Sequence, residues 1–382
     1  MPLTEEQEIT STARVIAAQP EEELVDDLDE AEEVIPCIYA INSYGADYPV
    51  DGLVKRIGAN DILVPKFSWN DPKGTEIAGF QREYVWPRPK ADRFIESLLL
   101  GLPVPGIFLV KEQTGRLLVL DGHQRLHTLR SYYDGIINGT EYRLAGVQDR
   151  FEGKRYRDLD TEDRRRLDDS IIHATIVRQV EPSEDQSSIY VVFERLNTGG
   201  VNLQPQEIRV ALYHGEFVRV LRELNDDPSW RSLYGKKSPR LKDMEMILRF
   251  FAFLYYSDKY KSPMKDFLNR YMATNRQLQK QSENDLKRIF TETSRTILDG
   301  LGFKAFRPQR AVNAAVVDSL MTAIAKRILG KGGIHNLKEL RARYGRLIRE
   351  KAYKSAIETG TAQEANVSAR LRRAEEVFAH LR

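Results

Sequence analysis

The chain has 382 residues and a formal net charge of only +2 at pH 7, with 41% hydrophobic and 30% charged residues. This composition supports two or more packed units, and no stretch is long and apolar enough for a transmembrane helix. We therefore expect a soluble, cytoplasmic protein with no membrane partner. The single cysteine, Cys37, excludes an internal disulfide and a cysteine metal site.

The charges are distributed unevenly along the chain. Residues 1–34 are rich in acids, contain one basic residue, Arg14, and lack the apolar segment of a secretory signal peptide. We expect them to form a disordered acidic leader. Basic residues are concentrated near the C-terminus, at Lys338, Arg341, Arg343, Arg346, Arg349, Lys351, Lys354, Arg370, Arg372 and Arg373. This asymmetry indicates either a DNA-binding tail, which the acidic leader can mask, or simply a solvated helix face.

Strands and helices alternate in the first half of the chain. The apolar patterns predict strands at 38–41, 62–65, 104–110, 117–120 and 171–180, and helices at 50–57 and 90–100. Gly101 marks the end of the second helix. This alternation predicts an α/β domain over residues 35–183.

Helical spacing dominates the sequence from Asp185 onward. Met244 to Tyr256 is strongly apolar and is predicted to be a buried helix, and further helices are expected at 285–298, 311–329 and 336–357. Residues 184–382 are therefore predicted to form an all-helical domain with a basic C-terminal tail. The fold class expected for the whole chain is α+β.

The segment LLVLDGHQRLHTLR (117–130) joins an apolar strand to a helix through a sharp turn. The N-terminus of a helix offers unpaired backbone N–H groups and a partial positive charge, which suit an anion such as phosphate. Gly122 lets the backbone approach a ligand closely, and Arg125 adds a forked cation. The same residues also fit an ordinary strand-ending turn in which Asp121 caps the helix.

A second polar segment, FQREYVW (80–86), precedes the helix predicted at 90–100. Arg82 can pair with a phosphate, and Gln81 can read a base or orient water. The alternative is that Arg82 stacks on a neighbouring aromatic ring and merely fixes the loop.

A third segment, FERLNTGG (193–200), ends a helix at Asn197 and continues into a glycine turn. Thr198, Gly199 and Gly200 can form a nest of backbone N–H groups for an anion. The alternative is a simple corner between two helices.

Four strings, taken in chain order, resemble the N-terminal domain of GmrSD-type restriction endonucleases: FQREYVW, IESLLLGLPVPGIFL, VLDGHQR and FERLNTGGVNLQPQEIR. The resemblance covers about residues 36–215 and implies a fold related to ParB and sulfiredoxin. It also implies binding and hydrolysis of a nucleoside triphosphate in the defence against foreign or modified DNA. The acid-Gly-Gln-Gln-Arg motif of the family falls here on Asp121, Gly122, His123, Gln124 and Arg125, so His123 replaces the first glutamine.

The resemblance gives each of these residues an expected role. Arg82 and Arg125 would hold phosphates, with Asp121 coordinating a divalent ion such as Mg²⁺ or positioning water. His123 or Gln124 would support the attacking water, and the glycine turn would close over the nucleotide. No Walker-type GxxxxGK[ST] sequence is present, so the expected enzyme is not a P-loop NTPase.

Complete nucleases of this family also carry an HNH-type domain, which needs paired histidines. After residue 215 the histidines are His335 and His380, and neither lies in a His-Asn-His pattern. We therefore expect an NTP-hydrolysing component of a prokaryotic restriction or phage-defence system, with DNA as a partner. The alternatives are a non-catalytic nucleotide- or DNA-binding switch, and a regulatory or scaffold subunit that acts with a partner nuclease. A homo-oligomer is compatible with each.

Overall fold

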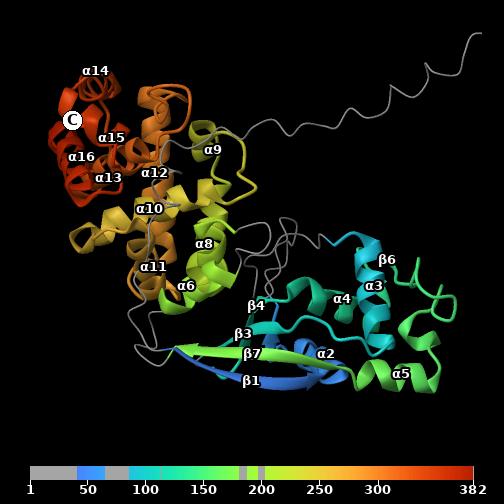
Figure 1. Ribbon diagram of the computed structural model, residues 1–382. Coiled ribbons are helices and arrows are strands. Elements are labelled where there is room, and N and C mark those ends of the chain that lie inside the picture. The colour runs from blue at the N-terminus through green and yellow to red at the C-terminus, as the bar shows by residue number, and fades with distance from the viewer. Residues whose placement is uncertain (1–40, 65–85, 113, 180–186, 197–202, 382) are drawn as a thin grey trace, which may run out of the picture.

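The computed structural model describes residues 41–64, 86–112, 114–179, 187–196 and 203–381. A mixed sheet with its own helices forms one end of the molecule, and a larger helical region forms the other (Figure 1). The expected α+β class, with a sheet followed by an all-helical region, is confirmed. The leader 1–34 and the boundary expected at residues 183–184 lie outside the described residues.

Five strands form the sheet, in the order β1–β7–β3–β4–β2. Their bounds are β1 Ile41–Pro49, β2 Ile62–Leu63, β3 Ile107–Lys111, β4 Leu117–Asp121 and β7 Ile171–Gln179. The pairs β1–β7 and β3–β4 are antiparallel, whereas β7–β3 and β4–β2 are parallel. A separate hairpin pairs β5 (Ile136–Ile137) with β6 (Thr140–Glu141).

Strand β4 contributes to two hydrophobic cores because its side chains alternate between the two faces of the sheet. Leu117 and Val119 pack with the helices of the N-terminal part. Leu118 and Leu120 pack with the helices of the C-terminal part. The helices of the N-terminal part are α2 Val50–Gly58, α3 Arg88–Leu99, α4 His123–Asp134 and α5 Thr161–Asp168.

The helical region is built around two buried helices, α10 (Lys242–Tyr256) and α13 (Ala314–Lys331), which contact each other. The burial of α10 confirms the helix predicted from its apolar sequence. The helices around them are α6 Ser187–Leu196, α7 Pro205–Leu212, α8 Glu216–Asn225, α9 Pro228–Tyr234, α11 Met264–Asn275, α12 Glu283–Leu301, α14 Leu337–Leu347, α15 Lys351–Glu358 and α16 Glu364–Phe378. Single 3₁₀ turns occur at Tyr156–Asp158 and Ser257–Lys259.

Two expectations for the C-terminal part were wrong. The helix predicted over 336–357 is divided into α14 and α15, because the chain leaves the helical conformation at Glu350, whose φ and ψ are −71° and 123°. Arg370, counted among the residues of the basic tail, is buried and donates to Asp318 at 2.9 Å. Arg249 donates to the same carboxylate at 2.7 Å. Arg370 is therefore part of the core and adds no surface charge.

An ion pair connects the sheet to the helical region. Glu112 directly follows β3 and is buried, and its carboxylate accepts a hydrogen bond of 3.1 Å from Arg276 at the end of α11. Arg276 also donates through Nε to the carbonyl of His214 at 2.6 Å. Burial lowers the pKa of His214, and the Arg276 cation lowers it further. This contact fixes the β3–β4 hairpin to the junction between α7 and α8.

Among the residues that the structure describes, no helix combines the length and the apolar character needed to cross a bilayer.

Candidate functional site

The turn between β4 and α4 has the form that the sequence predicts. Gly122 has a φ of 98°, in the left-handed region, and precedes the first residue of α4. A Cβ on Gly122 would lie 2.3 Å from Cγ2 of Ile107 on β3, so a side chain has no room there. Gly122 is the N-cap of α4 and has no side chain that could cap it, and within the described residues Asp121 makes no capping hydrogen bond. The first turn of α4 thus presents its backbone without a protein carboxylate in the capping position.

Asp121 and Arg125 form an ion pair at this turn. Nη2 of Arg125 donates to Oδ2 of Asp121 at 2.8 Å and to the carbonyl oxygen of Gly106 at 2.8 Å. The Arg125 side chain is 14% exposed, whereas that of Asp121 is 48% exposed. The Nε group of Arg125 is buried and has no hydrogen-bond partner within the described part of the chain. Arg125 is therefore held firmly in place, and the carboxylate of Asp121 reaches solvent.

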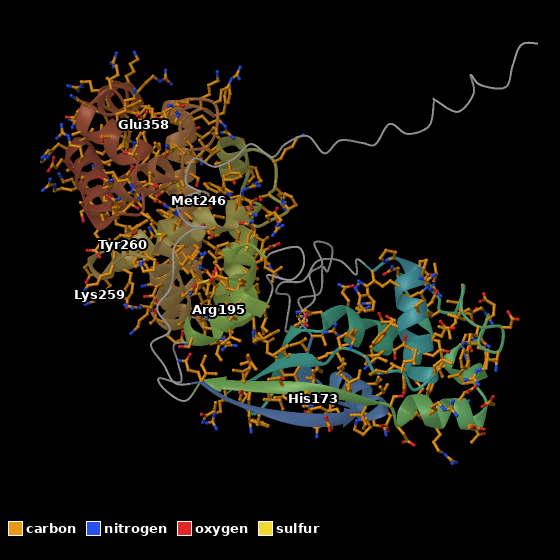
Figure 2. All side chains as sticks on the ribbon, in the orientation of Figure 1. His173, Arg195, Met246, Lys259, Tyr260 and Glu358 are labelled. Atoms are coloured by element: carbon orange, nitrogen blue, oxygen red, sulfur yellow. The ribbon has the colours of Figure 1, made fainter. Side chains whose placement is uncertain are left out.

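Gly106, whose carbonyl accepts the Arg125 hydrogen bond, has its backbone directly against strand β7. A Cβ at this position would lie 2.7 Å from the carbonyl oxygen of His173, which is on β7 (Figure 2). The sequence patterns do not identify Gly106 as a site residue. The available signal is a glycine between Pro105 and the apolar run of β3.

His123, at the first position of α4, is a neutral histidine with one free nitrogen. Its Nε2 lies 3.0 Å from the carbonyl oxygen of Leu120 and, because a carbonyl can only accept, Nε2 carries the proton. Its Nδ1 is then an acceptor, and it is buried with no hydrogen-bond partner among the described residues. Burial, and then the cationic Arg125 and the nearby His127, lower the pKa of His123 to about 3. At neutral pH the residue can accept a hydrogen bond but has no charge to offer a phosphate.

Gln124 connects α4 to the segment that enters α3. Its Oε1 accepts a hydrogen bond of 3.3 Å from the backbone N–H of Trp86. The Trp86 ring packs edge-on against Phe94 at 5.6 Å and has the ammonium of Lys90 4.8 Å from its centre. The last residue of the FQREYVW segment is thus fixed beside the first turn of α4.

The remaining predicted site residues cannot be placed. Gln81, Arg82, Asn197, Thr198, Gly199 and Gly200 lie outside the described residues. The convergence of the three segments stays a prediction. Trp86, the described end of the first segment, bonds to Gln124 of the second. Helix α6 leads into the third segment, carries Arg195 and contacts β7, which is not adjacent to β4 in the sheet (Figure 2).

The described residues include no group of three or more His, Cys, Asp or Glu side chains arranged to hold a metal ion. Mg²⁺, however, is commonly bound by one or two carboxylates together with waters and substrate phosphates. Asp121 fits that mode, since Oδ2 accepts from Arg125 and the other oxygen accepts no hydrogen bond within the described part of the chain. The turn can therefore offer one carboxylate oxygen and a helix N-terminus to a metal–phosphate group.

Comparison with known proteins adds a family assignment. Residues 67–214 match the family model described as the GmrSD restriction endonuclease, N-terminal domain. The matched stretch includes β3, β4, α4 and all three polar segments. No curated protein and no solved structure matched the chain, and the fold related to ParB and sulfiredoxin stays a prediction from the sequence. The resemblance that the four sequence strings indicate is confirmed over residues 67–214, which match the GmrSD-type N-terminal domain family.

Proposed function

We propose that this protein binds and hydrolyses a nucleoside triphosphate at the β4–α4 turn, as a component of a prokaryotic DNA restriction or phage-defence system. The description of its family supports the link to restriction. The observation that carries the nucleotide part is the uncapped N-terminus of α4 behind Gly122, with Arg125 and Asp121 fixed beside it. This arrangement supplies backbone donors, a cation and a carboxylate within one turn.

The helix N-terminus and Arg125 would bind phosphate oxygens. Backbone N–H groups at the start of a helix stabilise an anion, and the dipole of α4 adds to the effect. Arg125 uses Nη2 for Asp121 and Gly106, and its Nε has no partner among the described residues. Arg82 and Gln81, which precede Trp86 by a few residues, would also bind the nucleotide. The turn formed by Asn197, Thr198, Gly199 and Gly200 would cover it.

Asp121 would hold the divalent ion that accompanies the phosphates. Bound Mg²⁺ supplies charge neutralisation at the transferring phosphoryl group. The ion pair with Arg125 keeps the Asp121 carboxylate in one orientation, and the half-exposed side chain leaves its second oxygen accessible to solvent.

His123 would orient the attacking water. With Nε2 bonded to Leu120, the lone pair on Nδ1 can accept a hydrogen bond from a water molecule. A pKa of about 3 makes this imidazole a weak base, so positioning of the water is the role that its chemistry supports. The water would attack the γ-phosphorus as its bond to the diphosphate breaks, and the proton of the water would pass to an oxygen of the γ-phosphoryl group, which leaves as inorganic phosphate beside the nucleoside diphosphate.

A second candidate function is a nucleotide switch without turnover. The weak basicity of His123 favours it, because an imidazole with a pKa of about 3 is a poor general base at neutral pH. In this case nucleotide binding would change the contacts of the domain with DNA or with a partner nuclease.

Phosphate release and nucleotide binding distinguish the two. Purified protein is mixed with ATP, GTP or CTP and Mg²⁺, and the same measurements are made on Asp121→Asn and Arg125→Lys. The matched controls are Arg130→Lys and Asp134→Asn, which alter an exposed ion pair further along α4. We expect turnover in the wild type and the controls, and loss of at least tenfold in the two site variants. Binding without turnover supports the switch, and the absence of any binding contradicts both proposals.

A further inference from the structure

Helix α14 carries a basic face that no acidic side chain of the described residues neutralises. Lys338, Arg341, Arg346 and Arg349 are exposed, and none forms an ion pair within that part of the chain. At about 100° of rotation per residue, the four positions fall within an arc of about 140°, on one half of the helix. Arg349 lies just beyond the end of α14, but its N–H donates to the carbonyl of Arg346 at 3.1 Å and continues the turn.

The acidic residues closest in sequence are engaged elsewhere. Glu339 accepts from Nε of Arg343 at 2.9 Å. Glu350 accepts from both Nε and Nη2 of Arg373, at 2.8 and 2.7 Å. A pocket of about 390 Å³ beside α14 is lined by these paired groups, so its charges largely cancel. Arg346 also lines this pocket, and Arg341 donates through Nε to the carbonyl of Gly300 at 2.9 Å. Both side chains stay exposed and, with Lys338 and Arg349, they define what we call the outer face of α14.

We infer that this outer face of α14 binds the phosphate backbone of double-stranded DNA. The inference rests on the proposed function in taking DNA as the macromolecule concerned, and it assigns the surface of contact. Figure 1 places α14 at the end of the helical region that is remote from the sheet, so DNA bound there would leave the β4–α4 turn accessible.

The spacing of the four cations suits a duplex. At about 1.5 Å of rise per residue, the pair formed by Lys338 and Arg341 lies about 12 Å along the helix from the pair formed by Arg346 and Arg349. The major groove of DNA is also about 12 Å wide, so the two pairs can reach phosphates on both sides of it. Ala342 is exposed between the pairs, and Gly345 is half-buried. Neither has a long side chain that would hold the backbone of the duplex away.

A lipid surface fits this face less well. Helices that lie in a membrane interface bury large apolar side chains below their basic residues. The large apolar residues of α14 point inward: Leu340 and Leu347 are buried, and Leu337 and Tyr344 pack against the core of the helical region. An acidic lipid surface would find cations here but no apolar anchor.

The test is the salt dependence of DNA binding by the full-length protein. Anisotropy of a fluorescent DNA duplex of about 24 base pairs, without nucleotide, is measured from about 50 to 300 mM salt for the wild type and for Lys338→Gln/Arg346→Gln/Arg349→Gln. Removing three cations that contact phosphates should reduce the magnitude of the negative slope of log K against log salt by about 2 to 3, since each contact contributes about 0.9. At about 100 mM salt we expect at least a tenfold loss of affinity.

The matched control is Lys261→Gln/Lys280→Gln/Lys304→Gln, which removes three exposed cations of the helical region that have no ion-pair partner in the described part of the chain. Melting curves confirm that both variants fold. An unchanged slope in the α14 variant, an equal change in the control, or wild-type binding to phosphatidylserine vesicles but not to DNA would overturn the inference. DNA binding is measured without nucleotide and turnover without DNA, so failure of one proposal is separable from failure of the other.

Discussion

Gly122 and Ile107 lie so close that a methyl group on Gly122 would approach Cγ2 of Ile107 to 2.3 Å. Ile107 is a core residue on β3 and cannot move aside without disturbing the sheet. The φ of 98° adds strain for any other residue. Gly122→Ala should therefore lower the free energy of unfolding by about 2 to 4 kcal/mol. Urea denaturation measures the change.

Gly115→Ala is the matched control for this prediction. Gly115 also has a positive φ, of 84°, but a Cβ there meets no atom within 4 Å. Gly115→Ala should therefore lower the free energy of unfolding only by the backbone strain, about 1 to 2 kcal/mol. Equal losses in the two variants would mean that the contact with Ile107 is relieved at no cost.

Arg125→Lys should destabilise the protein although it keeps the charge. Nη2 donates both hydrogen bonds, at 2.8 Å each, and it lies one bond farther from Cα than the ammonium nitrogen of a lysine. A lysine should therefore lose at least one of the two bonds. We expect a loss of about 1 to 3 kcal/mol. Arg130→Lys, in an exposed pair with Asp134, should cost less than about 1 kcal/mol. A smaller effect at Arg125 than at Arg130, in the same denaturation experiment, contradicts the prediction.

The neutral His123 should make the stability of the protein depend on pH. Its pKa of about 3 in the folded state lies below the value near 6.5 of an unfolded chain, so the unfolded state binds the proton more readily. The stabilising contribution is complete above a pH of about 6.5 and is lost progressively as the pH falls toward about 3. Between about pH 7.5 and pH 5 the loss from this residue is at most about 2 kcal/mol.

His123→Gln tests this dependence and restores the glutamine of the family motif. A glutamine amide can donate to the Leu120 carbonyl and still offer an acceptor oxygen, but it does not titrate. The variant should retain nucleotide binding and lose less stability between about pH 7.5 and pH 5 than the wild type. His214, whose pKa burial also lowers, is present in both proteins and cancels from the comparison. If the free energy of unfolding falls equally with pH in the wild type and in His123→Gln, the assignment of His123 as a buried neutral histidine is wrong.

Arg276→Gln should weaken the joint between the sheet and the helical region. It leaves the buried carboxylate of Glu112 without its cation, at a cost of about 2 to 3 kcal/mol. Glu112→Gln/Arg276→Gln should recover part of the loss, which gives a coupling energy of about 1 kcal/mol or more in a double-mutant cycle. The exposed pair of Glu162 and Arg166 is the control, with coupling below about 0.5 kcal/mol. A coupling no larger than that of the control would show that the joint is held by other contacts.

The sequence predicts local features of this fold well and distant partners poorly. The strand β4, the turn at Gly122 and the start of α4 follow from an apolar run, a glycine and helical spacing, all within one short stretch of chain. For β1, the apolar pattern predicts only the first residue, Ile41. The strand contains Asn, Gly, Asp and Pro and has no regular alternation, so its conformation depends on nine residues of pairing with β7.

The same limit applies to the candidate site. The place of Arg125 on the first turn of α4 predicts a phosphate-binding residue. Its bond to Gly106, 19 residues earlier, arises from the pairing of β3 with β4, which the sequence does not specify. Likewise, the sequence predicts Arg370 to be a basic tail residue, because its partner Asp318 on α13 lies 52 residues earlier in the chain. Helical periodicity gives the face on which a charge lies, but not the carboxylate that neutralises it.

The double packing of β4 has a thermodynamic consequence for the whole chain. Val119 is anchored among the helices beside the sheet, while Leu118 and Leu120 are anchored among the C-terminal helices, directly before the turn that begins at Asp121. A molecule that immobilises this turn must therefore raise the melting temperature of both ends together, as one cooperative transition. Calorimetry would then show that a ligand bound at one short turn raises the melting temperature of the entire fold.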